Sequence, residues 1–436
     1  LMEVALLFTL VIGLLVIGVP IAVALGMSSL LFLLAFSDSS LASVAQTLFS
    51  AFEGHYTLLA IPFFILASSF MTTGGVAQRI IRFSIACVGH LPGGLAIAGV
   101  FACMLFAALS GSSPATVVAI GTIVIGGMIQ VGYSKDFAAG VICNAGTLGI
   151  LIPPSIMLVV MGPVLQVPVT DLFAAAIIPG ILLASMYAAY ALIRCWLNPS
   201  LGPILPPEQQ PITSDYYWLE AILVIGSIIT FFVLIVMAFS GSLAGYFAFS
   251  SLLIPLGWMA MMFFGSRWIR DNKPAGFFFS DLWYEFFMGL VPPSALVAFA
   301  LGSILFGWAT PTEGAGCGAF GALVLTVAYR KLTPSLLYNA LIKTLEISVL
   351  ILFLVAASNF FGAVFSRLGT PMVLTEFLLG WDISATYILL IIMALIFLLG
   401  WPLEWVPIVL IIVPILIPVL IKLDINLTWF GILVAV

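Results

Sequence analysis

The sequence is dominated by long apolar runs from which charged side chains are nearly absent. Lys and Arg number 12 and Asp and Glu 17 among 436 residues, so 7% of the chain is charged and 64% is hydrophobic. Ordinary globular domains carry about 25% charged residues, and no soluble fold has enough interior for this composition. Runs of about twenty apolar residues are long enough to cross a bilayer, so we expect an all-α polytopic membrane protein. The scarcity of Lys and Arg excludes a nucleic-acid-binding protein.

Interruptions by Gly, Pro and rare charges mark the ends of the expected helices. Every backbone polar group must be bonded internally in hydrocarbon, which favours helices, and the alternation typical of membrane β-barrels is missing from the sequence. The expected helices cover residues 4–17, 20–36, 57–78, 92–109, 115–130, 136–165, 171–193, 217–239, 244–265, 285–308, 314–329, 336–366, 384–399 and 405–421, and a last one begins near 427.

Basic residues between the apolar runs predict the orientation in the membrane. The positive-inside rule places nine of them in the cytoplasm, namely Arg79, Arg82, Lys135, Arg194, Arg267, Arg270, Lys273, Arg330 and Lys331. They can face the cytoplasm together only if residues 92–130 form a re-entrant hairpin that enters and leaves the membrane on one face. This solution leaves Arg367, Lys422 and the N-terminus outside, so the N-terminus is predicted to be periplasmic.

Three short matches relate the two halves of the chain at nearly one spacing. The matched segments are Val19–Ala22 with Thr310–Glu313, Ala67–Phe70 with Ala357–Phe360, and 132–137 with 424–429, at offsets of 291, 290 and 292 residues. An odd number of crossings lies between the halves, so the repeats are expected to run in opposite directions. Inverted repeats with broken helices are typical of secondary transporters.

This spacing divides the chain into three parts. Residues 1–196 form the first repeat, with hairpin 1 at about 92–130 and a broken helix at 136–165. Residues 197–283 form a cytoplasmic linker with two inserted transmembrane helices, and 284–436 form the second repeat, with hairpin 2 at about 384–421. The counterpart of Gly149–Ser155 should fall about ten residues beyond Val436 at this offset. The second repeat is therefore expected to be incomplete at the C-terminus.

Four polar breaks inside apolar segments are the candidate sites. Non-helical backbone at membrane depth is tolerated where it is buried in protein or lines a cavity. Its carbonyls and the neighbouring hydroxyls are hard oxygen ligands that suit a small cation such as Na⁺. The breaks are Leu109–Thr116, Asn144–Ser155, Ala309–Gly316 and Leu399–Trp405.

Each break also has a simpler interpretation. The first can be a turn between two ordinary helices, and the second a proline kink without a ligand. Glu313 is either a functional carboxylate inside the membrane or a cap at a helix N-terminus. Glu404 is either an ion ligand or an interfacial carboxylate between two Trp residues.

Nothing in the sequence indicates an enzyme. No Ser-His-Asp set, phosphate-binding loop or metal-binding motif is found in it, and only His55 and His90 could supply imidazole. Without an ATP-binding motif, uphill movement would have to draw on an ion gradient.

Three runs resemble the large membrane subunit of tripartite ATP-independent periplasmic (TRAP) transporters. They are SGSSPATVVAIG from Ser110, GYSKDFAAGVICNAGTLGILIPPS from Gly132 and GWATPTEGAGCGA from Gly307. The resemblance implies an elevator-type importer of organic anions in the bacterial inner membrane, coupled to Na⁺. It also implies two partners: a periplasmic substrate-binding protein that delivers the substrate and a small four-helix membrane subunit.

The same resemblance implies cation sites between each hairpin tip and the facing broken helix. The first would comprise Ser110, Ser112, Gly146, Thr147, Pro153 and Ser155, and the second would include Gly400, Pro402 and Glu404. Neighbouring residues of the breaks are expected to bind the substrate, namely Ser113, Pro114, Thr116, Asn144, Thr310, Thr312 and Glu313.

Two other functions remain open at this stage. One is a single-component Na⁺/dicarboxylate-type transporter that works without a binding protein. The other is a channel or scaffold in which the polar breaks are only turns. The insertion at 217–265 is a departure from shorter members of the family, and no role follows from it.

Overall fold

The computed structural model describes most of both predicted repeats. The described residues are 2–36, 46, 56–73, 75–205, 225–226, 257, 264, 285–367, 376, 380, 383–400 and 404–436. Pro402 lies outside them, as do the two expected inserted helices except for residues 225–226, 257 and 264. Every regular element among the described residues is a helix, which confirms the all-α prediction.

The helices of the first part follow the apolar runs, and their ends coincide with Gly, Pro and Ser residues. They are α1 (Met2–Val16), α2 (Ile21–Phe36), the 3-10 turn η1 (Tyr56–Leu59), α4 (Ala60–Thr73), α5 (Val76–Val88), α6 (Gly94–Ser110), α7 (Ser113–Val131), α8 (Lys135–Gly146), α9 (Leu148–Leu151), α10 (Ile156–Leu165) and α11 (Val169–Leu197).

The second part contains the π-helical segment η3 (Phe286–Leu290) and another series of helices. They are α15 (Val291–Leu305), α16 (Pro311–Ala328), α17 (Pro334–Arg367), α19 (Ala385–Leu399), α20 (Trp405–Pro407), the π-helical segment η4 (Ile408–Ile412), α21 (Val413–Lys422) and α22 (Leu427–Ala435).

One expected span is wrong at its end, and α5 was missed. The helix expected at 57–78 stops at Thr73, and Gly75 turns the chain with a φ of 82°. α5 then begins as an amphipathic helix with buried Ile80 and Ile81 on one side. Arg79 lies on α5, and its guanidinium carbon is 4.2 Å from the centre of the Tyr329 ring.

Several helices have the length and composition to cross a membrane. Among the described residues five qualify alone, and the bent pair Lys135–Leu151 and Ile156–Leu165 makes a sixth. The five are Tyr56–Thr73, Ser113–Val131, Val169–Leu197, Pro334–Val364 and Trp405–Lys422. The chain is therefore a multi-pass membrane protein.

Helix starts recur along the chain at one spacing. The starts of five pairs lie 289 to 292 residues apart: α1 and α15, α2 and α16, α6 and α19, α7 and α20, and α8 and α22. Left-handed turns recur as well, at Gly18 and Gly307 and at Gly132 and Asp424. The helix pattern thus repeats, while the opposite orientation of the two halves stays a prediction.

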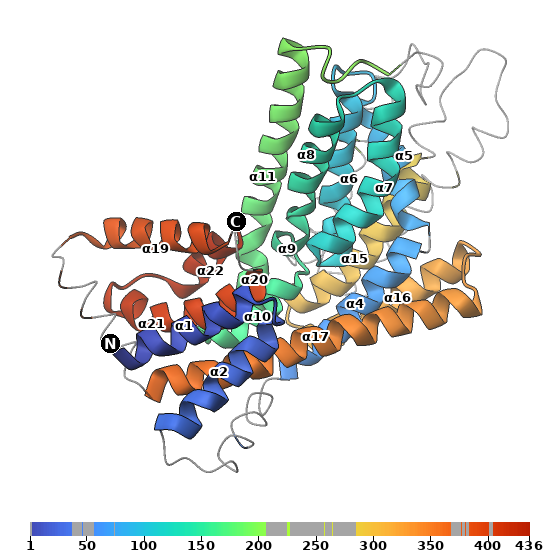
Figure 1. The fold of residues 1–436 in the computed structure, drawn as a ribbon. Coiled ribbons are helices and arrows are strands. Elements are labelled where there is room, and N and C mark those ends of the chain that lie inside the picture. Colours follow the sequence, from blue (N-terminus) through green and yellow to red (C-terminus); the bar gives the residue numbers. More distant parts are fainter. Residues whose placement is uncertain are drawn as a thin grey trace, which may run out of the picture.

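The first hairpin has both of its ends at one end of a helix bundle. α6, α7, α8 and α11 run side by side (Figure 1). At the hairpin base the Leu95 N–H donates to the Tyr133 hydroxyl at 3.3 Å, and the Gly93 N–H donates to the Gly202 carbonyl at 3.2 Å. The tip of the hairpin lies at the other end of these helices, where α9 and α10 begin.

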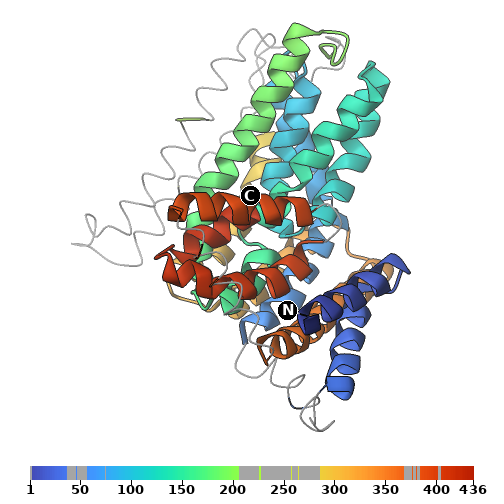
Figure 2. The ribbon, with the colours of Figure 1, turned by 60° about the vertical axis from the view of Figure 1, so that its left-hand side comes forward.

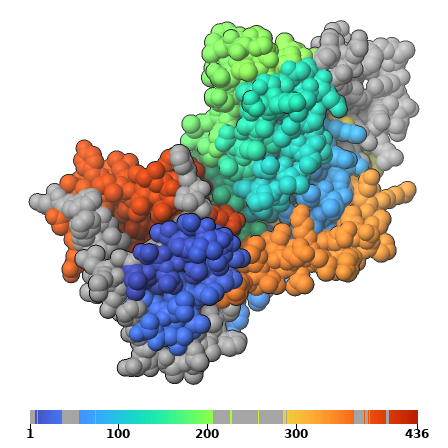
Figure 3. Space-filling view, in the orientation of Figure 1, coloured from blue at the N-terminus to red at the C-terminus, as the bar shows by residue number. Residues whose placement is uncertain are grey.

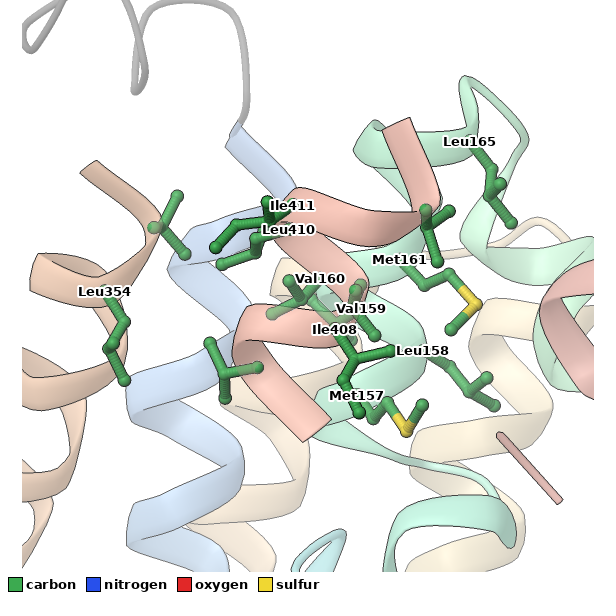
Figure 4. Packing of buried hydrophobic residues seen from close by; sticks show 14 of the residues in the cluster. Met157, Leu158, Val159, Val160, Met161, Leu165, Leu354, Ile408, Leu410 and Ile411 are labelled. Carbon is green, nitrogen blue, oxygen red and sulfur yellow. The ribbon is translucent and has the colours of Figure 1, made fainter. Parts of the chain in front are cut away.

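α10 is held by an apolar core that joins both halves of the chain. Its Met157, Val159 and Met161 side chains are buried next to Ile408 of η4, and Leu354 of α17 belongs to the same cluster (Figure 4). Lipid tails are as apolar as the side chains of a neighbouring helix, so the hydrophobic effect does not drive these helices together. Close van der Waals packing holds them together instead. The core fixes α10 and therefore the break that precedes it.

α22 also packs on this region, at the lower end of α11 (Figure 2). A Cβ on Gly431 would lie 2.7 Å from Leu165 Cδ1, so a larger residue there would require the Leu165 side chain to shift. In the space-filling view the surface of α7 and α8 (turquoise) adjoins that of α17 (orange) (Figure 3).

Candidate functional site

The tip of hairpin 1 is a tight turn of Gly111 and Ser112 between α6 and α7. Gly111 has a φ of 60°, a left-handed conformation that glycine adopts without steric cost, and its N–H donates to the Ala107 carbonyl at 3.0 Å. Pro114 lies in the first turn of α7, where its missing N–H has no helical partner to lose. The sequence Ser-Gly-Ser-Ser-Pro therefore ends one helix and begins the next.

The break in the second segment separates α9 from α10. The two arms of the bent pair are at 46° to each other. Pro153 and Pro154 have no N–H to continue the helix, and Ile152 before them is extended. Ser155 caps α10 by accepting from the Leu158 N–H at 3.4 Å, and its hydroxyl donates to the Ile150 carbonyl.

The tip and the break meet directly. The Ile156 N–H donates to the Gly111 carbonyl at 3.2 Å. A Cβ on Gly111 would lie 2.7 Å from the Pro154 carbonyl oxygen, and one on Gly149 would lie 2.6 Å from the Ser112 carbonyl oxygen. Both glycines are needed for this approach, and we call the contact between tip and break the tip–break junction.

Buried hydroxyls gather at the tip–break junction. The Ser110 Oγ lies 2.7 Å from Thr116 Oγ1, and the Thr116 hydroxyl also lies 2.9 Å from the Ser112 carbonyl oxygen, to which it can donate. Ser110, Thr116 and Ser155 are each 0% exposed. Such hydroxyls are hard oxygen donors with lone pairs that can face a cation.

A second set of contacts joins α7 to the end of α8. The Ser113 hydroxyl donates to the Thr147 carbonyl at 3.4 Å, and the Thr147 hydroxyl donates to the Asn144 carbonyl at 2.7 Å. A Cβ on Gly146 would lie 2.1 Å from a Val117 methyl group, so glycine is again required. Asn144 itself is exposed on α8, and Pro114 is exposed on α7.

Helix ends give the tip–break junction its electrostatic character. The C-terminal ends of α6 and α9 bring carbonyls that have no partner within their own helix, and the N-terminal ends of α7 and α10 bring N–H groups of the same kind. Of these N–H groups, those of Ile156 and Leu158 are bonded to Gly111 and Ser155. Carbonyl ends favour cations and N-terminal ends favour anions. The junction can therefore accommodate a cation beside an anion without a charged side chain of its own.

The structure places the residues predicted for the first cation site close to one another in the fold. Ser110, Ser112, Gly146, Thr147, Pro153 and Ser155 belong to the tip, the break or the helix end between them, as do Ser113 and Thr116, which were predicted to bind the substrate. Sequence reasoning did not assign Gly111 and Gly149 to the site, although glycines within a polar break are a signal of close backbone approach. It also missed Tyr187 of α11, whose hydroxyl lies 3.4 Å from Thr147 Oγ1.

Glu313 caps a helix, which is the second of its two predicted interpretations. The Thr310 side chain accepts from the Glu313 N–H at 3.3 Å, and Glu313 Oε2 accepts from the Thr310 N–H at 2.8 Å and from its hydroxyl at 2.9 Å. This reciprocal pair is a capping box at the start of α16. Thr312 donates to the Tyr56 carbonyl at 3.0 Å and so ties α16 to η1.

The second hairpin is described in part. Gly400 follows the end of α19 and Glu404 precedes α20, and both are exposed. Pro402 lies outside the described residues. The second predicted cation site therefore stays a prediction.

Comparison with known proteins identifies the family. Residues 8–436 match the family "Tripartite ATP-independent periplasmic transporter, DctM component". The chain is 36% identical to a C4-dicarboxylate TRAP transporter large permease protein of Pseudomonas aeruginosa over 416 residues, 95% of this chain and 80% of the relative. The corresponding protein of Rhodobacter capsulatus is 33% identical over 450 residues, 100% of this chain and 86% of the relative.

A third relative matches more strongly over a shorter stretch. The C4-dicarboxylate TRAP transporter large permease protein of Vibrio cholerae is 71% identical over 185 residues, and in this match the chain spans 41% of the relative's length. Together with the family match over nearly the whole sequence, these similarities show that the chain belongs to the DctM family, the large permease component of TRAP transporters.

Proposed function

We propose that this chain is the membrane-embedded transport subunit of a Na⁺-coupled secondary importer of organic anions. The observation that carries the proposal is the tip–break junction, where Ser110, Thr116 and Ser155 are buried beside free helix ends. Na⁺ prefers oxygen ligands, and neutral hydroxyls and carbonyls can replace its hydration shell without the cost of burying a carboxylate.

Na⁺ would link the tip to the break by binding oxygens of both. Ser110 and Ser112 would contribute from the tip, and Thr147 and Ser155 from the broken helix. Filling this site would neutralise the free carbonyls of α6 and α9 and leave the N-terminal ends of α7 and α10 to attract an anion. In this scheme the cation and the anion are cargo that moves together, with the hairpin and the broken helix as the moving unit of an elevator.

The substrate and the second site follow from the same scheme. Ser113, Thr116 and Asn144 would contact the anion from the first half, and Thr310 and Thr312 from the second. A second Na⁺ would bind near Gly400, Pro402 and Glu404. Relatives named for C4-dicarboxylates make this class of organic anion the first to test.

We further propose that the chain works with two partners, as the tripartite family description suggests. A periplasmic binding protein would deliver the anion, and a small four-helix membrane subunit would complete the scaffold in the bacterial inner membrane. Because delivery by a separate protein places much of the selectivity outside this chain, the binding protein is the better source for the identity of the anion.

Reconstitution tests the proposal. The chain and its small subunit are placed in proteoliposomes, the binding protein and a labelled C4-dicarboxylate are added outside, and uptake is measured with an inward Na⁺ gradient or an equal K⁺ gradient. We expect uptake with Na⁺ and at least tenfold less with K⁺. Equal uptake with both would contradict Na⁺ coupling, and uptake of free anion by this chain alone would favour a single-component transporter.

A further inference from the structure

A groove of about 150 Å³ lies between α8 and α11, outside the tip–break junction. Asp136, Gly140 and Asn144 line it from α8, and Tyr187 and Tyr190 line it from α11. None of these residues except Asn144 was predicted to have a role. The groove is therefore a feature that the sequence did not predict.

The lining of the groove is mostly apolar and includes Phe137 and Val141, and a polar stripe follows α8 along it. Asp136, Gly140 and Asn144 follow one another at intervals of four residues and so lie on one side of the helix, and Thr147 continues the stripe three residues later. This stripe extends about 17 Å at 1.5 Å per residue. Asp136 lies in the first turn of α8, beside Lys135 at the hairpin base. Asn144 lies about two turns further along the helix, where an amide is costly to place against lipid, and this favours water in the groove.

The middle of the groove is open. Among the described residues, no atom outside the nearby backbone of α8 lies within 4 Å of the position that a Cβ on Gly140 would take. A larger residue at this position would therefore project into the groove without displacing backbone. Gly140 is thus the natural point at which to close it.

The groove joins the hairpin base to the tip–break junction. Its outer end is at Asp136, next to Ser134, whose N–H donates to the Leu201 carbonyl at 3.2 Å. Its inner end is at Tyr187, whose hydroxyl shares a hydrogen bond of 3.4 Å with Thr147 Oγ1. Thr147 in turn accepts from Ser113 at the tip.

We propose that this groove is an access path along which a small hydrated cation passes between the hairpin-base end of the bundle and the tip–break junction. Asp136 attracts the cation at the mouth, amide and phenol oxygens replace part of its hydration, and Tyr187 closes the inner end through Thr147. The inference rests on the proposed function, because the cation is the coupling ion of that proposal. It adds a route that leads to the ligands of the ion and ends at one of them, Thr147.

A reagent that reacts with a cysteine in the groove tests the access path, because it blocks the groove after the protein has folded. Cys143 and Cys317, which are exposed, are first replaced by Ser, and Gly140→Cys is introduced into this background. One purified batch is divided, and half is reacted with methanethiosulfonate ethyltrimethylammonium before reconstitution. The matched control is Gly126→Cys on α7, where a Cβ also meets no atom within 4 Å.

We expect the reagent to label Gly140→Cys and to lower the initial rate of Na⁺-driven uptake at least tenfold, while labelled Gly126→Cys keeps its rate within twofold. Absence of labelling at position 140, an unchanged rate after labelling, or an equal loss in the control would overturn the access path. Gly140→Leu provides a second measurement without a reagent, compared with Gly126→Leu, and should show the same difference between the two sites.

The two proposals fail in different ways. If the unmodified protein takes up the anion equally with Na⁺ and K⁺, the proposed function is wrong before any variant is compared. If uptake requires Na⁺ and the block at position 140 has no effect, the coupling stands and only the path is wrong.

Discussion

The Ile156 N–H donates to the Gly111 carbonyl at 3.2 Å, and this bond ties the tip of one helical hairpin to the first residue of α10. A carbonyl oxygen has two lone pairs, so Gly111 can accept this bond and still face a cation. The same bond makes the hairpin and the broken helix one mechanical unit. Variants around this pair therefore test both the packing and the proposed chemistry of the tip–break junction.

Replacing Gly111 with Ala should disrupt the tip–break junction. The new Cβ would lie 2.7 Å from the Pro154 carbonyl oxygen, and the φ of 60° is strained for any residue with a Cβ. The left-handed conformation alone costs about 1–2 kcal/mol. We expect uptake to fall at least tenfold with membrane insertion retained, whereas Gly126→Ala, in open space within α7, should leave uptake unchanged. Wild-type uptake by Gly111→Ala would show that the close approach is not needed.

Replacing Thr116 with Ala should weaken the response to Na⁺. The change removes a buried hydroxyl that bonds Ser110 Oγ at 2.7 Å, and so removes a ligand or the group that orients one. We expect the Na⁺ concentration for half-maximal uptake to rise about tenfold, which corresponds to about 1.4 kcal/mol. Thr122→Ala is the matched control, because this threonine of α7 is exposed and bonds only the Val118 carbonyl among the described residues. Identical Na⁺ activation curves for both variants would argue against a cation at Ser110.

Replacing Ser155 with Ala tests whether this residue contributes to transport as well as capping α10. Ser155 and Ser134 both cap helices, the first by accepting from the Leu158 N–H and the second from the Phe137 N–H. Loss of either cap should lower stability by about 1 kcal/mol, which thermal unfolding in detergent can measure. Only Ser155→Ala should also lose Na⁺-dependent uptake, because Ser134 lies at the hairpin base. Equal uptake by the two variants would show that Ser155 acts only as a helix cap.

The Glu313 carboxylate of the capping box should support the start of α16 rather than transport. Thr310→Ala removes the hydroxyl that accepts from the Glu313 N–H, so the unfolding temperature should fall. Glu313→Gln keeps a side chain that can complete the box, and it should keep both the unfolding temperature and uptake. A large loss of uptake in Glu313→Gln at unchanged unfolding temperature would instead assign the carboxylate to substrate or ion binding, as the sequence first suggested.

Tyr187→Phe should loosen the inner end of the groove. The change removes the phenol oxygen that lies 3.4 Å from Thr147 Oγ1 and keeps the aromatic ring. If this bond restrains Thr147, the Na⁺ concentration for half-maximal uptake should rise several-fold at an unchanged maximal rate. Tyr190→Phe, which removes a phenol oxygen of the same groove one turn further along α11, should raise this concentration less. A larger rise of this Na⁺ concentration in Tyr190→Phe than in Tyr187→Phe would show that Tyr190, and not Tyr187, closes the inner end of the groove.

Local sequence patterns predicted most of the helices. Apolar runs gave α6, α7, α11 and α19 to within a few residues, because the bilayer requires long apolar helices whatever their neighbours are. Gly, Pro and Ser clusters likewise located the tip at Gly111 and the break at Pro153, since these residues act on their own backbone. α5 was missed because its amphipathic face interrupts the apolar run in which Arg79 and Arg82 lie.

The sequence by itself determined that this protein is a helical membrane protein, where its helices break and which family it resembles. These properties depend on hydrophobicity, backbone chemistry and short motifs, all of which are local. The tertiary structure alone decided that Gly111 meets Ile156, that Gly149 lies against Ser112 and that Tyr187 reaches Thr147. Such contacts join residues far apart in the chain, and they depend on how whole helices pack, which no local pattern specifies.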